Sequence, residues 1–174
     1  MEISSKSTDL LGVQLSAFNL MIETKKTSKK FSVECAFQSS KVFEHGDPYK
    51  DLLCNDSRSA KKDERLKSSG RLIAFEYSGK RWKLEPKTMF YDWLYINALG
   101  LDCNKELAEQ VIEYDDFTDI EFNPQKSINC QARAVALYVS LHRRGLLQRV
   151  LCDPEYYVQL INNTVSSTEQ LELF

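Results

Sequence analysis

Paired metal-binding residues are scarce in this chain. Its cysteines are odd in number and widely spaced, none forms a CxxC pair, and only two histidines accompany them. The five cysteines are Cys35, Cys54, Cys103, Cys130 and Cys152. A structural zinc site is built from such pairs, so we expect no zinc site and no other cofactor. Scattered single thiols indicate a reducing compartment.

Long apolar runs and an excess of charge of one sign are also missing. No stretch has the length and apolarity of a membrane span, and no secretory segment is recognisable, so we predict a cytoplasmic protein with no membrane partner. The net charge is −2. This excludes nucleic-acid binding through an overwhelmingly basic surface and leaves a local basic groove open.

Length and composition predict one domain. The chain has 174 residues, of which 43% are hydrophobic and 11% aromatic, enough to bury a sizeable core. No internal repeat or low-complexity linker divides it. We predict an α+β fold in which helices dominate, with a small β-hairpin or sheet, spanning residues 1–174.

Strand patterns occur in two segments. Residues 12–24 are apolar and partly alternating, which favours a strand or an extended segment. Residues 71–86 alternate about the dipeptide Ser78-Gly79, which is typical of a β-hairpin.

Helical patterns fill much of the remaining chain. A charged segment predicts an exposed helix that ends at Gly70, and an aromatic-rich segment, 88–99, predicts a buried core helix more readily than a ligand stack. Further helices are predicted within residues 49–54, 104–114, 127–145 and 153–163, with a fraying end over 164–174.

A helix predicted for residues 32–43 carries a row of polar side chains. Ser32 is placed to cap its first turn, where Glu34 adds a favourable negative charge. Glu34, Gln38 and Lys41 recur at i, i+4 and i+7 and therefore share one face. Lys41 has two interpretations, either a functional amine or a surface lysine paired with a neighbouring glutamate, and composition does not separate them.

The segment 113–129 is an unusually long connection that contains five carboxylates. Loops of this length are usually functional, although a solvated loop whose acids cap neighbouring helices is the alternative. The alternation of acids with Phe117, Ile120 and Phe122 favours a partly buried loop. No Ser-His-Asp or Cys-His pairing is recognisable, so Cys35 and Cys130 are interpreted as small buried hydrophobic residues.

Five short motifs resemble, in order and rough spacing, those of the NADAR family. They are LSAF (15–18), SVECAFQSSK (32–41), SGR (69–71), FTD (117–119) and SIN (127–129). The resemblance covers roughly residues 15–145 and is greatest to the branch encoded beside DarT-type toxins, which ADP-ribosylate DNA bases. Only the SxExxFQxxK pattern is specific by itself. The chain departs from the family at Cys35 (His in the family), Phe117-Thr118 (Trp-Gly) and Ala132 (Gly).

The resemblance implies a NADAR-type fold and a hydrolase that removes ADP-ribose from guanine in DNA, acting as an antitoxin. In this function Glu34 and Asp119 would stabilise positive charge on the ribose and position water, and Lys41 would capture the anomeric carbon as a Schiff base. A lowered pKa of Lys41 would be needed, which burial favours and Glu34 opposes.

The same resemblance implies a set of substrate-binding residues and partners. Gln38 and Asn129 would hold ribose hydroxyls or phosphate oxygens, Arg71 would pair with a phosphate, and Phe18 or Phe117 would stack on a base. The expected partners are ADP-ribosylated single-stranded DNA, the product ADP-ribose, and a cognate DarT-type toxin.

Two other functions are compatible with the motifs. One is an N-glycosidase of a small ribosylamino-pyrimidine metabolite, and the other is a non-catalytic protein that binds the toxin or ADP-ribose. The lysines of KKTSKK (25–30) and KRWK (80–83) favour a nucleic-acid strand over a free nucleotide.

Overall fold

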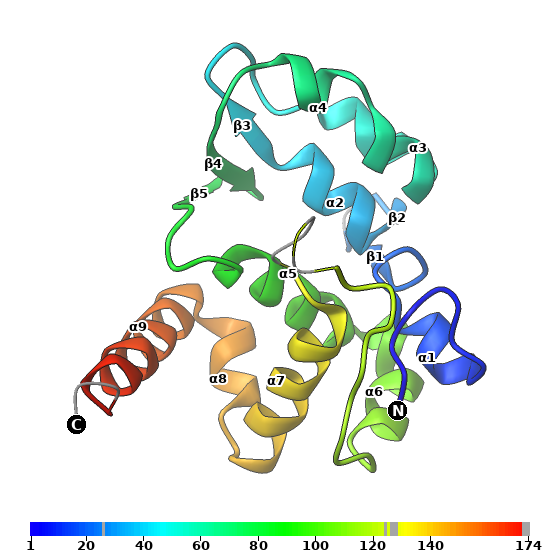
Figure 1. The fold of residues 1–174 in the computed structure, drawn as a ribbon. Helices are drawn as coiled ribbons and strands as arrows, with labels where there is room; N and C mark the ends of the chain where they lie inside the picture. Colours follow the sequence, from blue (N-terminus) through cyan, green and yellow to red (C-terminus); the bar gives the residue numbers. More distant parts are fainter. Residues whose placement is uncertain (26, 124, 126–128, 172–174) are drawn as a thin grey trace.

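Two layers of secondary structure make up the fold, and Figure 1 shows them one above the other. The computed structural model describes residues 1–25, 27–123, 125 and 129–171, with only the backbone described for 164–171. The upper layer holds an antiparallel sheet in the order β3-β4-β5 and short helices beside it. Its elements are α2 (Val33–Ser39), β3 (Lys41–Phe43), η1 (Lys50–Cys54), α3 (Ser57–Lys62), α4 (Arg65–Ser68), β4 (Leu72–Tyr77) and β5 (Lys80–Trp82).

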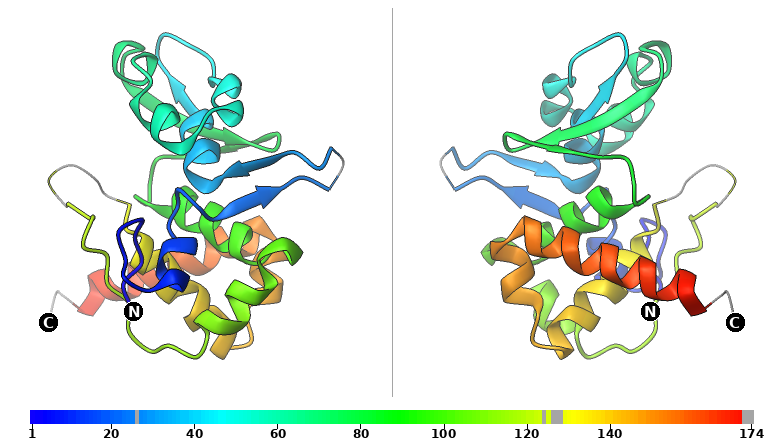
Figure 2. Two further views of the ribbon diagram at one scale, coloured as in Figure 1. Left: turned by 90° about the vertical axis from the view of Figure 1, so that its right-hand side faces the viewer. Right: turned by 90° about the vertical axis from the view of Figure 1, so that its left-hand side faces the viewer.

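The lower layer is entirely helical in Figure 1, apart from its connections. Its elements are α1 (Leu10–Gln14), α5 (Met89–Leu99), η2 (Asp102–Asn104), α6 (Lys105–Val111), α7 (Gln131–Arg143), α8 (Leu147–Cys152) and α9 (Pro154–Leu171). Between the layers, β1 (Met21–Glu23) and β2 (Lys30–Ser32) form a separate antiparallel hairpin, which projects sideways in Figure 2. The fold is therefore α+β with helices dominant, as predicted. None of the helices in the described part of the chain is long and apolar enough to cross a bilayer.

The predicted hairpin about Ser78-Gly79 is confirmed as β4 and β5. Both turn residues have positive φ, 50° and 76°, and Tyr77 pairs with Lys80 across them. Two consecutive left-handed residues match the right-handed twist of the flanking strands, which is why a glycine is favoured here.

The helix predicted for residues 32–43 is wrong in its second half. α2 ends at Ser39, and the chain then enters β3, where Lys41 pairs with Phe75 of β4. Val42 and Phe43 are β-branched and aromatic, and both are buried in the sheet. Pairing with β4 therefore overrides the helical pattern, and Lys41 belongs to a strand.

Three other predicted elements differ from the structure in their bounds. Residues 12–24 begin within helix α1, which Asp9 caps by accepting a 2.9 Å hydrogen bond from the Leu11 N–H, so only β1 of that segment is strand. The charged helix is divided into α3 and α4 at Asp63, and ends at Gly70 with φ +84° as predicted. α9 continues to Leu171 in the segment expected to fray, and α8 was not predicted.

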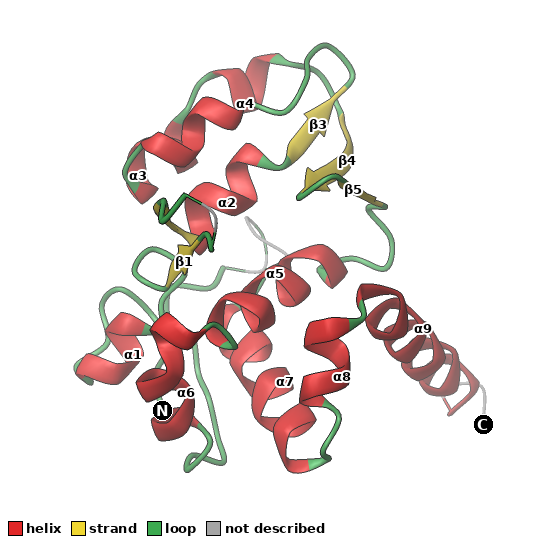
Figure 3. Cartoon of the chain, turned by 180° about the vertical axis from the view of Figure 1, so that it is seen from behind, coloured by secondary structure: helices red, strands yellow, loops and turns green. Residues whose placement is uncertain are grey.

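α5 is the central core helix, as predicted. Every residue in it except Asn97 is buried. It lies beneath α2 and beside α7, an arrangement seen from behind in Figure 3. The ring of Phe90 stacks on Phe75 of β4 at 4.7 Å between centroids, and Trp93 lies 4.6 Å from Trp82 of β5. These contacts pack α5, in the lower layer, against the sheet of the upper layer.

The long segment after α6 is anchored by the start of the chain. The Ile3 N–H donates to the Thr118 carbonyl at 2.8 Å, and the Thr118 N–H donates to the Met1 carbonyl at 2.9 Å. Phe117 and Phe122 are half-buried, as predicted for a partly buried loop. Ile120 is 70% exposed, so the prediction is wrong at this position. The pairing fixes the backbone immediately before Asp119.

Candidate active site

α2 presents Glu34 and Gln38 from a helix whose side chains are all buried. Ser32 caps the helix as predicted, because its Oγ accepts a 3.1 Å hydrogen bond from the Cys35 N–H. Gln38 Nε2 donates to Glu34 Oε1 at 2.8 Å, so the i, i+4 pairing predicted from the sequence is present. Glu34 is only 5% exposed. The structure thus holds a carboxylate inside the protein with one oxygen fixed.

Two acceptor atoms of this pair accept no hydrogen bond from the residues that the structure describes. Gln38 Oε1 is sealed from solvent and accepts no hydrogen bond from the described residues. Within the same part of the chain, Glu34 Oε2 receives no donor either. Buried polar atoms are normally paired, and unpaired ones concentrate where a ligand supplies the partner. The pair is therefore suited to accept hydrogen bonds from hydroxyl groups.

Lys41 lies next to this pair although it comes from β3. Its Nζ is 5.0 Å from the ring centroid of Phe37, which lies on α2 between Glu34 and Gln38. Burial lowers the pKa of Lys41 below its usual value; the Glu34 carboxylate opposes this effect, and the positive charge of Lys61 adds to it. Lys41 forms no ion pair with any described carboxylate, and Glu44 pairs with Arg71 instead. The surface ion pair considered for Lys41 is therefore absent from the described residues.

Asp119 is joined to α2 by a chain of hydrogen bonds through Gln131. Asp119 Oδ2 accepts from the backbone N–H and from Nε2 of Gln131, both at 3.2 Å. Gln131 Oε1 accepts a 2.6 Å hydrogen bond from the Ala17 N–H, and the Ala17 carbonyl accepts from the Glu34 N–H at 2.9 Å. The Asp119 carboxylate is thus connected to the backbone of Glu34. Gln131 was missed in the sequence, where its place after the SIN motif was the only signal.

Tyr91 of α5 lies among these acids. Its ring meets Phe37 edge-on at 5.2 Å between centroids. Burial raises the pKa of its hydroxyl well above the usual value, and the negative charges of Glu34, Asp92 and Asp119 add to the effect. Carboxylates from α2, from α5 and from the loop after α6 therefore all raise the pKa of this one buried tyrosine.

Other predicted residues are less closely connected to this site. Phe18 is half-buried beneath Lys61, whose Nζ is 5.1 Å from its ring centroid. Arg71 is exposed and forms a 3.1 Å ion pair with Glu44 at the far end of β3, so no contact connects it to Glu34. Asn129 is half-buried just before α7, and the other two residues of the SIN motif lie outside the described residues.

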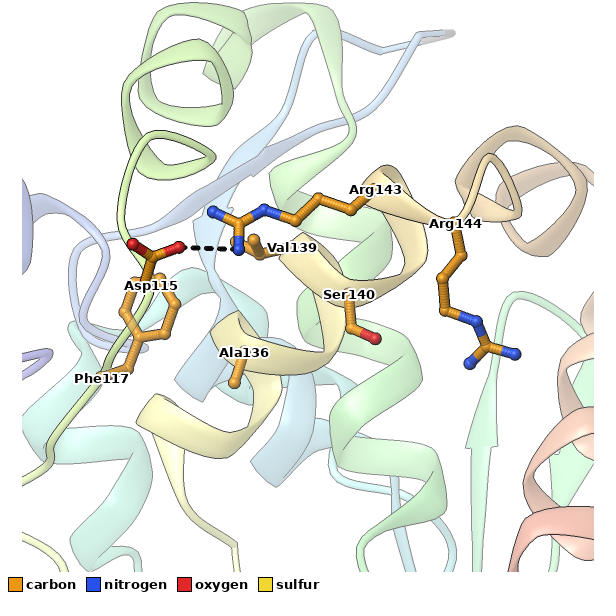
Figure 4. Close-up of a pocket in the computed structure, with 7 residues that line it drawn as sticks. All are labelled: Asp115, Phe117, Ala136, Val139, Ser140, Arg143 and Arg144. Carbon is orange, nitrogen blue, oxygen red and sulfur yellow. Dashed lines mark ion pairs between the residues drawn. The ribbon is translucent and has the colours of Figure 1, made fainter.

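Phe117 lies in a different hollow, shown in Figure 4. This hollow has a volume of about 260 Å³ and is bordered by a 2.9 Å ion pair between Arg143 and Asp115. Its lining consists of Asp115, Phe117, Ala136, Val139, Ser140, Arg143 and Arg144. None of these is a predicted catalytic residue. Phe117 packs against α7 there, so its role in stacking on a base stays a prediction without structural support.

The cysteines and acids offer no metal centre in the described part of the chain, where no cluster of three or more ligating side chains occurs. Cys35 is buried, and its Sγ donates to the Asn55 carbonyl at 3.2 Å. Cys130 is half-buried, and burial raises the pKa of its thiol. Cys35 is therefore a small buried residue, as predicted, whereas Cys130 is only half-buried.

Asp92 is a buried carboxylate at the edge of the site. Its Oδ2 accepts from Thr88 Oγ1 at 2.8 Å and lies 3.6 Å from the Arg133 guanidinium, while Oδ1 has no partner in the described chain. Burial raises the pKa of Asp92 to about 6. The charge of Arg133 and the hydrogen bond from Thr88 lower this pKa, but by less than burial raises it. Thr88 is held in the left-handed region with φ 70°.

This carboxylate predicts a stability that decreases with rising pH. Between its usual pKa of 3.8 and about 6, the folded state holds more protons than the unfolded state. The free energy of unfolding should therefore fall by about 1.4 kcal/mol per pH unit, about 3 kcal/mol in all, and then level off above pH 6. Denaturant unfolding of the parent and Asp92→Asn across this range measures the difference. Parallel curves for the two proteins would contradict the assignment.

Comparison with known proteins identifies the family. The family model of the DarT1-associated NADAR antitoxins matches residues 1–171. No curated protein is detectably similar to the chain in sequence. The matched range contains α2 with Glu34 and Gln38, β3 with Lys41, and the loop with Asp119. The chain therefore belongs to the family of DarT1-associated NADAR antitoxins.

Proposed function

We propose that this protein acts as an antitoxin by removing ADP-ribose from guanine bases in DNA. The reaction breaks the bond between the anomeric carbon of the distal ribose and the base nitrogen, and water completes it. The observation that carries the proposal is that Lys41 lies beside the buried Glu34–Gln38 pair, while Gln131 links Asp119 to Ala17 next to the same helix. Membership of an antitoxin family supports the biological role.

Glu34 is suited to stabilise the charge that develops on the sugar. Breaking an N-glycosidic bond gives the ribose oxocarbenium character, and a carboxylate held in place stabilises that charge without reorganising. Gln38 fixes one oxygen of Glu34 at 2.8 Å, and the other has no donor among the described residues. The free oxygen can therefore face the anomeric carbon or hold the attacking water.

Lys41 offers a covalent route for the same cleavage. When the ribose ring opens, the C–O bond of the ring breaks and the anomeric carbon becomes an imine of the base nitrogen. A neutral Lys41 amine adds to that carbon, the base leaves with a proton, and water later hydrolyses the lysine Schiff base. Burial of Lys41 supports this role because it increases the neutral fraction of the amine.

Asp119 is the second acid in the proposed mechanism. Its Oδ2 is held by Gln131 at the beginning of α7, and its Oδ1 accepts from the Glu121 N–H at 3.1 Å. These donors keep the carboxylate oriented. It can activate the water that resolves the intermediate, acting from the loop side while Glu34 acts from α2.

Charge on the upper layer supports a nucleic-acid substrate. Arg58, Lys61 and Lys62 of α3 are exposed and have no ion pair with a described residue, and Lys61 lies over Phe18 beside the site. Unpaired cations attract phosphates. Among the lysines of KKTSKK and KRWK, two already form ion pairs within the protein. Lys30 pairs with Glu23, and Lys80 pairs with Glu155.

Substrate competition tests this proposal. The protein would receive equal concentrations of a single-stranded oligonucleotide with one ADP-ribosylated guanine and of a ribosylamino-pyrimidine phosphate. Mass spectrometry would follow the loss of ADP-ribose from the oligonucleotide and the release of the pyrimidine from the small substrate. We expect kcat/KM to favour the oligonucleotide by at least about a hundredfold, and the preference to shrink as salt screens the phosphates. Preferential cleavage of the free nucleotide would make the protein a metabolite glycosidase instead.

A further inference from the structure

Two tyrosines one turn apart on α5 differ in what their hydroxyls contact. The hydroxyl of Tyr95 donates to the Leu15 carbonyl, and the side chain is fully buried. Tyr91 is 4% exposed, and its hydroxyl forms no hydrogen bond with any residue that the structure describes. Unlike Gln38 Oε1, this hydroxyl is not sealed from solvent, so a ligand in the site can reach it and supply its partner.

The surroundings of Tyr91 indicate what that group is. Its ring contacts Phe37, which also lies beneath Lys41, so the tyrosine borders the proposed reaction centre. The oxygens that Glu34 and Gln38 leave open are acceptors, and the second N–H of Gln38 Nε2 is the one further donor that the pair itself offers. A sugar hydroxyl both donates and accepts, so a site that holds one well needs a donor opposite those acceptors.

We propose that the hydroxyl of Tyr91 is a further substrate-binding group of this site and donates a hydrogen bond to a hydroxyl oxygen of the distal ribose. The inference rests on the proposed function, because it takes the ribose of an ADP-ribosyl group as the ligand. The same ribose hydroxyl, or its cis neighbour, donates to Glu34 Oε2 or to Gln38 Oε1. Donor and acceptors then come from α5 and α2, on opposite layers of the fold.

Tyr91 acts here as a donor that keeps its proton. Losing the proton would place a phenolate among Glu34, Asp92 and Asp119 in a buried environment, and these charges raise the pKa of the hydroxyl. The same charges make Tyr91 a poor general acid for the departing base. Its contribution is therefore to hold the sugar, and it should appear in binding of the product as well as of the substrate.

The test compares Tyr91→Phe with Tyr95→Phe, which removes a matched hydroxyl from the same helix. Tyr91→Phe keeps the ring contact with Phe37 and should melt close to the parental temperature, because the hydroxyl it removes pairs with no residue that the structure describes. It should raise KM for the modified oligonucleotide and the Kd for ADP-ribose, measured by calorimetry, about tenfold each. Tyr95→Phe should melt several degrees lower and leave both constants within twofold of the parent.

The outcomes separate this inference from the proposed function. A Tyr91→Phe protein with parental KM and parental Kd would overturn the inference while leaving the hydrolase intact. If the parent binds ADP-ribose but cleaves no modified DNA, the proposed function fails, and the ADP-ribose Kd alone decides the inference. A weaker Kd in Tyr91→Phe would then support it, and an unchanged Kd would overturn it. Absence of ADP-ribose binding by the parent would overturn both.

Discussion

Glu34→Gln is expected to reduce kcat/KM for release of ADP-ribose from modified DNA by about a thousandfold. The amide keeps the shape of the side chain, and its oxygen can still accept from Gln38 Nε2, so the buried helix should stay intact. What it loses is the negative charge that stabilises the oxocarbenium-like ribose. Mass spectrometry of a modified oligonucleotide over time, with equal melting temperatures as a check on folding, gives the result.

A matched control and a test in cells make this prediction sharper. Glu44→Gln removes an exposed carboxylate that pairs with Arg71 beyond β3, and it should leave the rate unchanged. In cells that express the toxin, Glu34→Gln should no longer protect, while Glu44→Gln should. Full protection by Glu34→Gln would mean that the protein neutralises the toxin by binding, without catalysis.

Lys41→Met is expected to reduce cleavage by at least about a hundredfold and to abolish covalent trapping. Methionine retains an apolar chain over the Phe37 ring, so the change removes the amine with little loss of packing. Borohydride added during turnover should fix ADP-ribose to the parent, and peptide mapping should find the adduct on Lys41. Burial lowers the pKa of this amine, so trapping should persist to a lower pH than it would for an ordinary exposed lysine.

Lys105→Met is the control for this substitution. Lys105 is an exposed residue of α6 that pairs with Glu109 on the same helix, and its removal should leave trapping at the parental level. An adduct on another lysine, or parental cleavage by Lys41→Met, would exclude the Schiff-base route. In that event Glu34 and Asp119 alone would have to support hydrolysis.

The sequence predicts those features that depend on nearby residues. The cap at Ser32, the contact between Glu34 and Gln38, and the turn at Ser78-Gly79 all join residues no more than four positions apart. Local periodicity carries information at this range. The buried α5 was predictable for a similar reason, because its aromatic content alone requires a core position.

Features that depend on distant pairing were not predictable in the same way. The segment that contains Lys41 has a helical pattern, and only its pairing with Phe75 makes it a strand. Gln131 joins Asp119 to Ala17 across 114 positions of sequence, a connection that no local pattern signals. The position of Tyr91 among three acids likewise arises from the packing of two layers.

Two predicted binding residues have contacts outside the network of Glu34 and Asp119, and their roles stay predictions. Arg71 pairs with Glu44 away from the acids, and Phe117 packs in the hollow beside α7. Both were identified by their place in a short motif. Conversely, the cations of α3 that have no ion pair with a described residue, among them Lys61 over the Phe18 ring, belong to none of the motifs and became apparent only from the fold.

The most direct measurement uses DNA that has been modified by the toxin and then freed of it. A single-stranded oligonucleotide carrying one ADP-ribosylated guanine would be purified and incubated with the parent and, in parallel, with Glu34→Gln. The account predicts that the parent removes one ADP-ribose and restores unmodified guanine, and that Glu34→Gln does not. Persistence of the adduct with the parent, or equal removal by both proteins, would contradict it.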